Sequence, residues 1–239
     1  MADYVLLDGV RTWYEEHGDG DPLVLLHPGG AGVDARAFGP NLGSLTAQFC
    51  VHTPERRAHG HTPDVAGPIT FDAMAQDTIA FMETVVGRQA HVVGSSDGAV
   101  VGLLVALRRP DLIDRLVLVA GVFHFNGWLP HVIDPNVEPP EFLARLYEEV
   151  SPDRAGHYQV VVDKLARMHW EEPILEADDL GELRSRTLVM VGDDDEVRLE
   201  HALAMYRGIP DAELMVVPGT SHGLLVESLI SATASSSNS

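Results

Sequence analysis

Short, almost entirely apolar runs recur along the chain, and they constrain its fold more than any other feature of the sequence. The clearest are Leu23–Leu26, Ala90–Val93, Leu116–Ala120 and Thr187–Val191, and longer helix-patterned segments separate them. A strand without polar alternation has both faces buried, which is typical of a parallel sheet covered by helices on both sides. The sequence therefore predicts an α/β fold.

The remaining strands and helices complete this alternation. Asp8-Gly9 is a strong two-residue turn signal between the strand candidates Tyr4–Leu7 and Val10–Glu16, so we expect an antiparallel pair at one sheet edge. Further strands are predicted at Phe49–Thr53 and Glu213–Val217. Helices are expected where apolar residues recur at helical spacing or where a longer run is nearly all apolar. They are Phe71–Val86, Ala99–Leu107, Leu199–Tyr206 and a short one at Gly223–Ile230.

Residues 122–176 break the regular alternation. Prolines punctuate this segment, and two amphipathic helices are predicted between them, at Glu141–Val150 and Asp153–Trp170. We therefore expect a core domain made of residues 1–121 and 177–239, with residues 122–176 inserted over the sheet as a small helical cap.

The net charge of the chain argues against a nucleic-acid partner. Lys and Arg number 16 against 36 Asp and Glu, which gives −20 at pH 7, and the basic residues are scattered. Proteins that bind phosphate backbones gain affinity from clustered Lys and Arg, and an anionic membrane surface attracts the same clusters. We expect neither nucleic acid nor a membrane as a partner.

The single cysteine, Cys50, excludes an intramolecular disulfide and a Cys-based zinc site. His59 and His61 have no partner at a recognisable ligand spacing, so no metal and no cofactor are expected. The first four residues lack the basic and apolar regions of a secretory signal, and no apolar stretch approaches 18 residues. We expect a cytoplasmic protein that is a monomer or a homodimer.

A Gly-x-Ser-x-Gly motif, Gly94-Ser95-Ser96-Asp97-Gly98, lies between a predicted buried strand and a predicted buried helix. In that position the chain must turn sharply, and the glycines remove Cβ clashes at the turn. The central serine is then held in strained backbone, with its hydroxyl exposed above the sheet at a helix N-terminus. The motif therefore predicts that Ser96 is a nucleophile.

A serine hydroxyl needs a base to remove its proton, and the base needs a carboxylate to orient it. One histidine, His222, follows the last predicted strand, and Asp193-Asp194-Asp195-Glu196 follows the strand before it. The order along the chain is Ser, then Asp, then His.

In these features the chain resembles the α/β-hydrolase superfamily over nearly its whole length. The resemblance implies a mostly parallel eight-stranded sheet whose first pair is antiparallel, with a cap inserted after the sixth strand. It also implies that Asp195 is the catalytic acid, because the family's acid usually stands three residues after the glycine that ends its strand, here Gly192. His222, in a Gly-x-Ser-His-like loop, would be the catalytic base.

The loop His27-Pro28-Gly29-Gly30 resembles the family's His-Gly-x-x loop, with Pro28 where glycine is more usual. The resemblance implies that backbone N–H groups of Gly29 and Asp97 form the oxyanion hole, with Gly30 as the alternative to Gly29. His27 is expected to brace the loop.

The Asp97 side chain has two possible roles. A Ser-Asp-Gly turn also occurs in relatives similar to valacyclovir hydrolase, where the aspartate binds the amino group of the substrate. The other role, which we favour, is a charge in the first helical turn that complements the helix dipole.

Aromatic residues in the insertion predict a modest, largely apolar substrate site. We take Phe123, Trp128 and Trp170 as candidate substrate-binding residues, together with Gly30. The predicted function is hydrolysis of a carboxylic ester of a small molecule through an acyl-enzyme. Hydrolysis of a lactone, an amide or a C–C bond, and a non-hydrolytic receptor or lyase on the same fold, remain open alternatives.

A remote alternative is a nucleotide-dependent oxidoreductase. Gly30-Ala31-Gly32-Val33-Asp34-Ala35 follows a strand and fits Gly-x-Gly-x-x-Ala. Three residues intervene after the strand, however, and this interpretation leaves Ser96, Asp195 and His222 unexplained.

Overall fold

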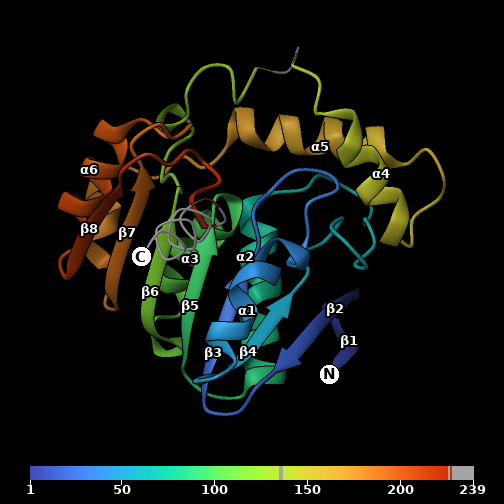
Figure 1. The fold of residues 1–239 in the computed structure, drawn as a ribbon, viewed down its shortest axis with the longest axis horizontal. Helices are drawn as coiled ribbons and strands as arrows, with labels where there is room; N and C mark the ends of the chain where they lie inside the picture. Colours follow the sequence, from blue (N-terminus) through green and yellow to red (C-terminus); the bar gives the residue numbers. More distant parts are fainter. Residues whose placement is uncertain (135–136, 226, 228–239) are drawn as a thin grey trace, which may run out of the picture.

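The computed structural model describes residues 1–134, 137–225 and 227, and its centre is an eight-stranded sheet (Figure 1). The strand order is β1-β2-β4-β3-β5-β6-β7-β8, and β2 alone runs antiparallel to the other strands. The strands are β1 (Ala2–Leu7), β2 (Val10–His17), β3 (Asp21–Leu26), β4 (Phe49–Pro54), β5 (Ala90–Ser95), β6 (Ile113–Val119), β7 (Arg186–Gly192) and β8 (Ala212–Val217). The predicted mostly parallel sheet with an antiparallel first pair is confirmed.

Strand β3 shows why the apolar runs are continuous. Leu23 and Leu25 face a cluster that includes Phe38, whereas Val24 and Leu26 face the larger core on the opposite side of the sheet. The first cluster packs against α1 (Gly39–Leu45), and the second contains α2 (Phe71–Phe81) and α3 (Asp97–Arg108). Each strand position is therefore buried on one side or the other, as the absence of polar alternation predicts.

The cap segment, by which we mean residues 122–176, supplies α4 (Glu141–Val150) and α5 (Tyr158–Glu171). Figure 1 shows both helices lying across the end of the sheet to which the parallel strands point. The predicted start of the second helix at Asp153 is wrong. The Asp153 carboxylate accepts hydrogen bonds from the Tyr147 hydroxyl and the Asp64 amide, and Gly156 has a φ of +80°, so residues 153–157 form a turn.

Other helical segments also differ from the sequence prediction or are only partly described. Helix α2 ends at Phe81 and continues as one π-helical turn, Met82–Val86, which stops at the left-handed Gly87. The prediction missed a 3₁₀ turn at Ala35–Phe38 and the helix α1 that follows it. Helix α1 contains two glycines and a proline, which are poor helix formers in general, although proline is accepted in the first turn. Of the predicted helix at 223–230, residues 226 and 228–230 lie outside the described residues.

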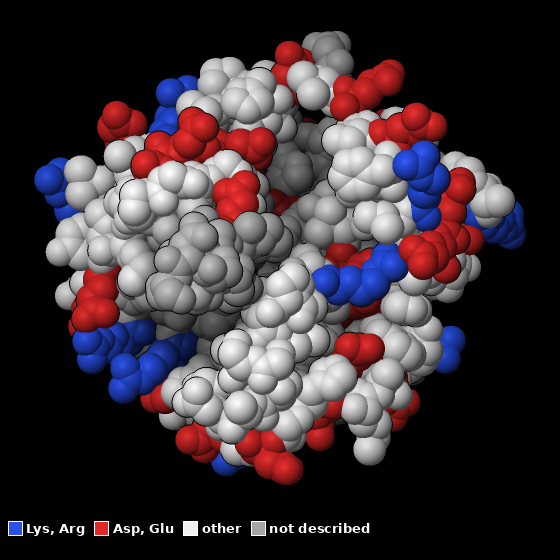
Figure 2. Space-filling model, viewed as in Figure 1, with Lys and Arg blue, Asp and Glu red and all other residues white. Residues whose placement is uncertain are grey.

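Within the described residues, the remaining helical elements are α6 (Leu199–Gly208), which packs on β7 and β8, and three short turns. These turns are the 3₁₀ helices Pro110–Leu112, Phe125–Gly127 and Ala177–Glu182. Within the described part of the chain, no helix combines the length and the apolar composition needed to cross a membrane. Figure 2 shows acidic side chains spread over the visible face, with basic ones in smaller separate groups.

The two glycines of the Gly-x-Ser-x-Gly motif allow β5, β3 and α3 to approach closely. A methyl group at Gly98 would lie 2.0 Å from the Leu26 carbonyl oxygen, and one at Gly94 would lie 2.2 Å from the Gly98 carbonyl oxygen. These neighbours are backbone atoms, which cannot move aside without shifting a strand or a helix.

We therefore predict that Gly98→Ala lowers the free energy of unfolding by about 2 kcal/mol or more, although alanine favours helix. Urea denaturation checks this. The matched control is Gly43→Ala in α1, where no atom lies within 4 Å of the new methyl group, and there we expect no loss of stability. Equal stability of the two variants would contradict the close-approach explanation.

Candidate active site

Ser96 lies at the turn between β5 and α3, where the sequence motif places it. Its backbone is strained, with φ +54° and ψ −119°, a region that side-chain-bearing residues rarely adopt. The turn is held by the Ser96 amide, which donates to the Val119 carbonyl (2.8 Å), and by the Ser96 carbonyl, which accepts from Ala99 and Val100 in the first turn of α3. The hydroxyl is thereby fixed at the carboxyl end of the sheet.

Hydrogen bonds join the three predicted catalytic side chains in a line. His222 Nδ1 donates to Asp195 Oδ1 at 2.7 Å, which leaves Nε2 to accept from the Ser96 hydroxyl at 2.9 Å. The Asp195 carboxylate is itself fixed by two backbone amides, those of Gly192 (3.0 Å) and Val197 (3.1 Å). This geometry can transfer a proton from Ser96 to His222.

The three consecutive aspartates after β7 have different positions. Asp195 is buried and contacts His222, whereas Asp193 and Asp194 are exposed. Asp193 accepts hydrogen bonds from the amides of Gly219 and Thr220, and so it braces the loop that carries His222. Ser221 donates to Glu227 from both its amide and its hydroxyl, which supports the other side of His222.

The electrostatics of the pair favour a charged aspartate and a basic imidazole. Burial by itself would lower the pKa of His222, but the hydrogen bond to Asp195 and its charge raise it on balance above the usual 6.5. Burial would raise the pKa of Asp195, but His222 and the two backbone amides hold it below its usual value.

The loop after β3 is held by a buried network. Arg56 is buried, and its guanidinium donates to the carbonyl oxygens of His27 and Pro28, the latter at 2.9 Å. His27 Nε2 accepts from the Arg56 amide, so Nδ1 carries the proton and donates to the Pro28 carbonyl (2.7 Å). Burial holds the pKa of His27 well below 6.5, so the ring is neutral. His27 braces this loop.

Gly29 and Asp97, the two predicted oxyanion-hole residues, lie against each other. A methyl group on Gly29 would be 1.8 Å from Asp97 Oδ2. Within the described residues, no acceptor bonds to the amide N–H of Gly29 or of Asp97, so both donors are free for a ligand. Amide donors without a protein acceptor are one requirement of an oxyanion hole.

Asp97 is 1% exposed, and its carboxylate pairs with His169 of α5. His169 Nε2 lies 2.8 Å from Oδ1 and 3.0 Å from Oδ2. Asp97 does lie in the first turn of α3, where the favoured sequence interpretation puts a charge that complements the helix dipole, but its carboxylate is buried. The structure pairs it with a residue of the cap segment.

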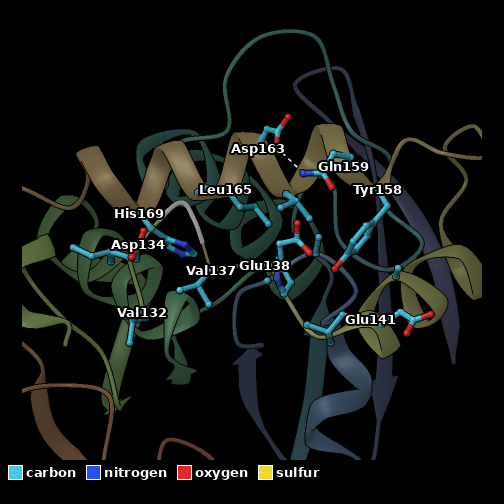
Figure 3. Close-up of a pocket in the computed structure, with 18 residues that line it drawn as sticks. Val132, Asp134, Val137, Glu138, Glu141, Tyr158, Gln159, Asp163, Leu165 and His169 are labelled. Carbon is cyan, nitrogen blue, oxygen red and sulfur yellow. Dashed lines mark hydrogen bonds between the residues drawn. The ribbon is translucent and has the colours of Figure 1, made fainter. Parts of the chain in front are cut away.

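A cavity of about 430 Å³ lies beneath α5, between that helix, α4 and the segment that precedes α4 (Figure 3). Most of its lining residues are apolar, although the side chains of four acidic residues, Asp134, Glu138, Glu141 and Asp163, also line it. Gly30 and Ala31 of the loop after β3 and His169 of α5 belong to the same wall. The other lining residues include Val132, Ile133, Leu143, Tyr158, Val162 and Leu165. The volume suits a small organic ligand.

The structure places the four residues predicted to bind substrate in different surroundings. Gly30 lines the cavity, whereas Trp128 is buried with its ring 5.7 Å from that of His222. Phe123 stacks on His201 of α6 at 4.0 Å. Trp170 is 57% exposed and does not line the cavity.

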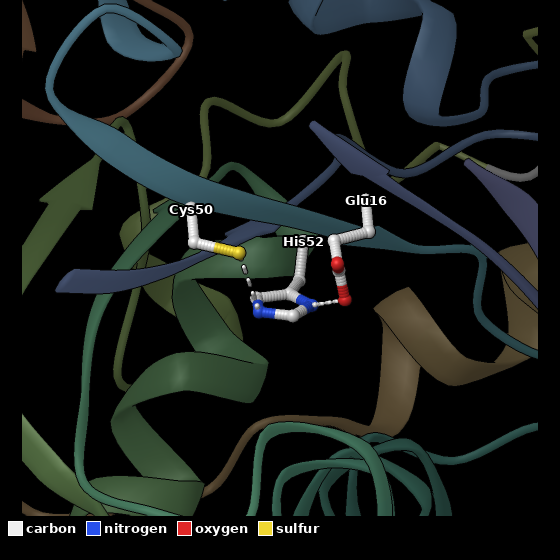
Figure 4. Close-up of side chains that lie close together, drawn as sticks. All are labelled: Glu16, Cys50 and His52. Atoms are coloured by element: carbon white, nitrogen blue, oxygen red, sulfur yellow. Dashed lines mark hydrogen bonds and ion pairs between the residues drawn. The ribbon is translucent and has the colours of Figure 1, made fainter. Parts of the chain in front are cut away.

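A separate group of possible metal ligands lies on β2 and β4. Glu16 and His52 are directly paired across these strands, and Cys50 lies on the same face as His52 (Figure 4). His52 Nε2 is 3.6 Å from Cys50 Sγ, and Nδ1 is 3.6 Å from a Glu16 oxygen. Among the described residues this is the one such group. His59 and His61 have other partners, the Arg57 carbonyl and the Glu55 carboxylate.

Sequence reasoning missed Arg56 and His169 as parts of this site. Leu165 and Met168 mark the buried face of α5, and His169 lies four residues after Leu165, on the edge of that face. The pattern therefore contained a signal that His169 points inward. Its partner, Asp97, is 72 residues away, and no local pattern identifies it.

Comparisons with known proteins agree with this architecture. The chain matches the model of the alpha/beta hydrolase family over residues 23–232. RutD of Caulobacter segnis, named for a proposed carbamate hydrolase activity, is 27% identical over 254 aligned residues that cover 92% of each chain. The human serine hydrolase BPHL is 33% identical over 118 residues, which are 48% of this chain and 40% of BPHL.

A solved structure has the same fold. A meta-cleavage product hydrolase from Pseudomonas fluorescens IP01 matches with a TM-score of 0.76 at 24% identity, covering 95% of this chain and 93% of that chain. Because the family model spans most of the sequence and the sheet has the order described above, this chain belongs to the alpha/beta hydrolase family.

Proposed function

We propose that this protein is a serine hydrolase that cleaves a carboxylic ester of a small, largely apolar molecule through an acyl-enzyme. The observation that carries the proposal is the hydrogen-bonded line from Asp195 through His222 to the strained Ser96. A buried carboxylate, an imidazole and a hydroxyl in this order supply a nucleophile, its base and the group that orients the base.

In the proposed reaction, Ser96 Oγ attacks the substrate carbonyl carbon while His222 Nε2 takes its proton. The amides of Gly29 and Asp97 donate to the oxygen that becomes negative, and Asp195 stabilises the imidazolium. His222 then returns the proton to the leaving alcohol. A water molecule attacks the acyl-enzyme in the second half of the reaction, with His222 again acting as base.

The cavity beneath α5 supports a small, largely apolar acyl or alcohol group. It begins at Gly30, next to the proposed oxyanion residue Gly29, and its walls carry mostly aliphatic side chains. Trp128 packs against His222 and is well placed to shield the imidazole from water.

Carbamate hydrolysis is a second candidate, because a relative named for that activity matches over 92% of both chains. Esters, carbamates, lactones and amides all pass through attack of a nucleophile on a carbonyl carbon, so the same residues serve each. The test is a panel of chromogenic esters of increasing acyl length beside matched carbamates, lactones and amides. We expect turnover to be fastest with short esters, and faster carbamate turnover would favour the second candidate.

The pH dependence of the reaction follows from the His222–Asp195 pair. His222 must be neutral to accept a proton, and Asp195 raises its pKa above 6.5, so kcat/KM should fall as pH decreases through a value above 6.5. In Asp195→Asn the charge that raises the pKa of His222 is lost, whereas burial still lowers that pKa. The fall of kcat/KM on the acid side should therefore move to lower pH. Profiles of kcat/KM from pH 5 to 9 measure both. A limb at the same pH in both proteins would show that another group titrates.

A further inference from the structure

The charge of Asp97 lies beside the place where a substrate carbonyl would bind. Asp97 directly follows Ser96, its amide belongs to the proposed oxyanion hole, and its carboxylate packs on Gly29. A negative group so close to the carbonyl would attract a positively charged substituent on a substrate, provided that the substituent could reach it.

His169 occupies the approach to that carboxylate. Its Nε2 lies within hydrogen-bond distance of both Asp97 oxygens, and the same side chain lines the cavity together with Gly30. Figure 3 shows His169 extending from α5 at one end of the cavity. The imidazole therefore stands between the cavity and Asp97.

Asp97 and His169 stabilise each other's charged forms. Burial alone would raise the pKa of Asp97, but His169 and, less strongly, Arg56 lower it on balance. Burial alone would lower the pKa of His169, but Asp97 raises it on balance. The Asp97 carboxylate is thus already paired with a cationic partner, and a cation on the substrate would have to displace His169 to bind it.

We propose that His169 is a specificity-determining residue, which excludes substrates with a positive charge next to the scissile carbonyl by occupying both oxygens of Asp97. Its role in selectivity rests on the function proposed above. Four carboxylates also line the cavity, but they are exposed, so salt and water screen their attraction for a cation. They are those of Asp134, Glu138, Glu141 and Asp163.

The first test compares two esters with the same leaving group, one with an α-amino acyl group and one with the des-amino acyl group. The wild type should show no preference for the amino ester. His169→Leu should raise the ratio of kcat/KM, amino over des-amino, at least tenfold, because Asp97 then lacks its partner. His169→Gln, which retains an N–H donor, should raise it less.

Two control variants separate this effect from a merely structural one. In Asp97→Asn/His169→Leu the ratio should return to the wild-type value, since the attracting charge is gone. Arg167→Gln removes an exposed cation from the same helix, and we expect the wild-type ratio. An unchanged ratio in active His169→Leu would overturn the proposal, whatever happened to the absolute rates.

A second measurement needs no turnover. His169→Ala leaves space beside Asp97, so propylammonium chloride should raise the Tm of this variant relative to sodium chloride at equal ionic strength. The wild type and Asp97→Asn/His169→Ala should show no such difference. If propylammonium stabilises His169→Ala but the wild type hydrolyses no ester, the proposed function alone is refuted. Ester hydrolysis without either His169 effect would refute this inference alone.

Discussion

Ser96→Ala is expected to reduce kcat/KM for esters by on the order of 10⁶-fold while the protein stays folded. The variant cannot form the acyl-enzyme, and what turnover remains would come from the oxyanion donors and substrate binding. Alanine lacks only the hydroxyl, whose partner is His222, so the packing around the turn is retained. Ester hydrolysis measures the loss, and urea denaturation verifies the fold.

Ser95→Ala is the matched control, because Ser95 is the adjacent buried serine at the end of β5 and takes no part in the line of hydrogen bonds. We expect activity near that of the wild type. Similar losses in the two variants would mean that the turn, rather than the Ser96 hydroxyl, is what the substitution disturbs. Full activity of Ser96→Ala would refute Ser96 as the nucleophile.

Asp195→Asn should decrease kcat by about 10⁴-fold, as loss of the anionic partner does in other Ser-His-Asp sites. An asparagine amide can donate to His222 Nδ1, which would favour the wrong tautomer and leave Nε2 unable to accept the Ser96 proton. It also provides no charge to stabilise the imidazolium. Steady-state kinetics at the pH optimum of each protein measures the effect.

The neighbouring aspartates provide controls with different expectations. Asp194→Asn should be close to the wild type, because the contact of Asp194 with the His222 loop is made by its backbone amide, which donates to the Thr220 carbonyl. Asp193→Asn should be mild but measurable, because its carboxylate accepts from the amides of Gly219 and Thr220. A larger loss at Asp194 than at Asp195 would contradict the assignment of the acid.

The sequence by itself determined the sheet and the position of the Ser96 turn. Both depend on short-range rules: strands buried on two faces lose polar alternation, and a sharp strand-to-helix turn needs glycines where a methyl group would strike backbone, as at Gly94 and Gly98. Loops after parallel strands share one edge of the sheet, so the order of the strands brought Asp195 and His222 near Ser96.

Only the tertiary structure decided which residues surround the hydrogen-bonded line of Asp195, His222 and Ser96. Whether Asp97 faced solvent, substrate or protein depended on the path of the cap segment, and the structure places His169 against it across 72 residues of sequence. The hydrogen bonds from Arg56 to the carbonyls of His27 and Pro28 likewise depend on how two separate segments pack. Residue periodicity encodes which face of an element is buried, but a hydrogen-bond partner depends on where a distant segment packs, which no local pattern contains.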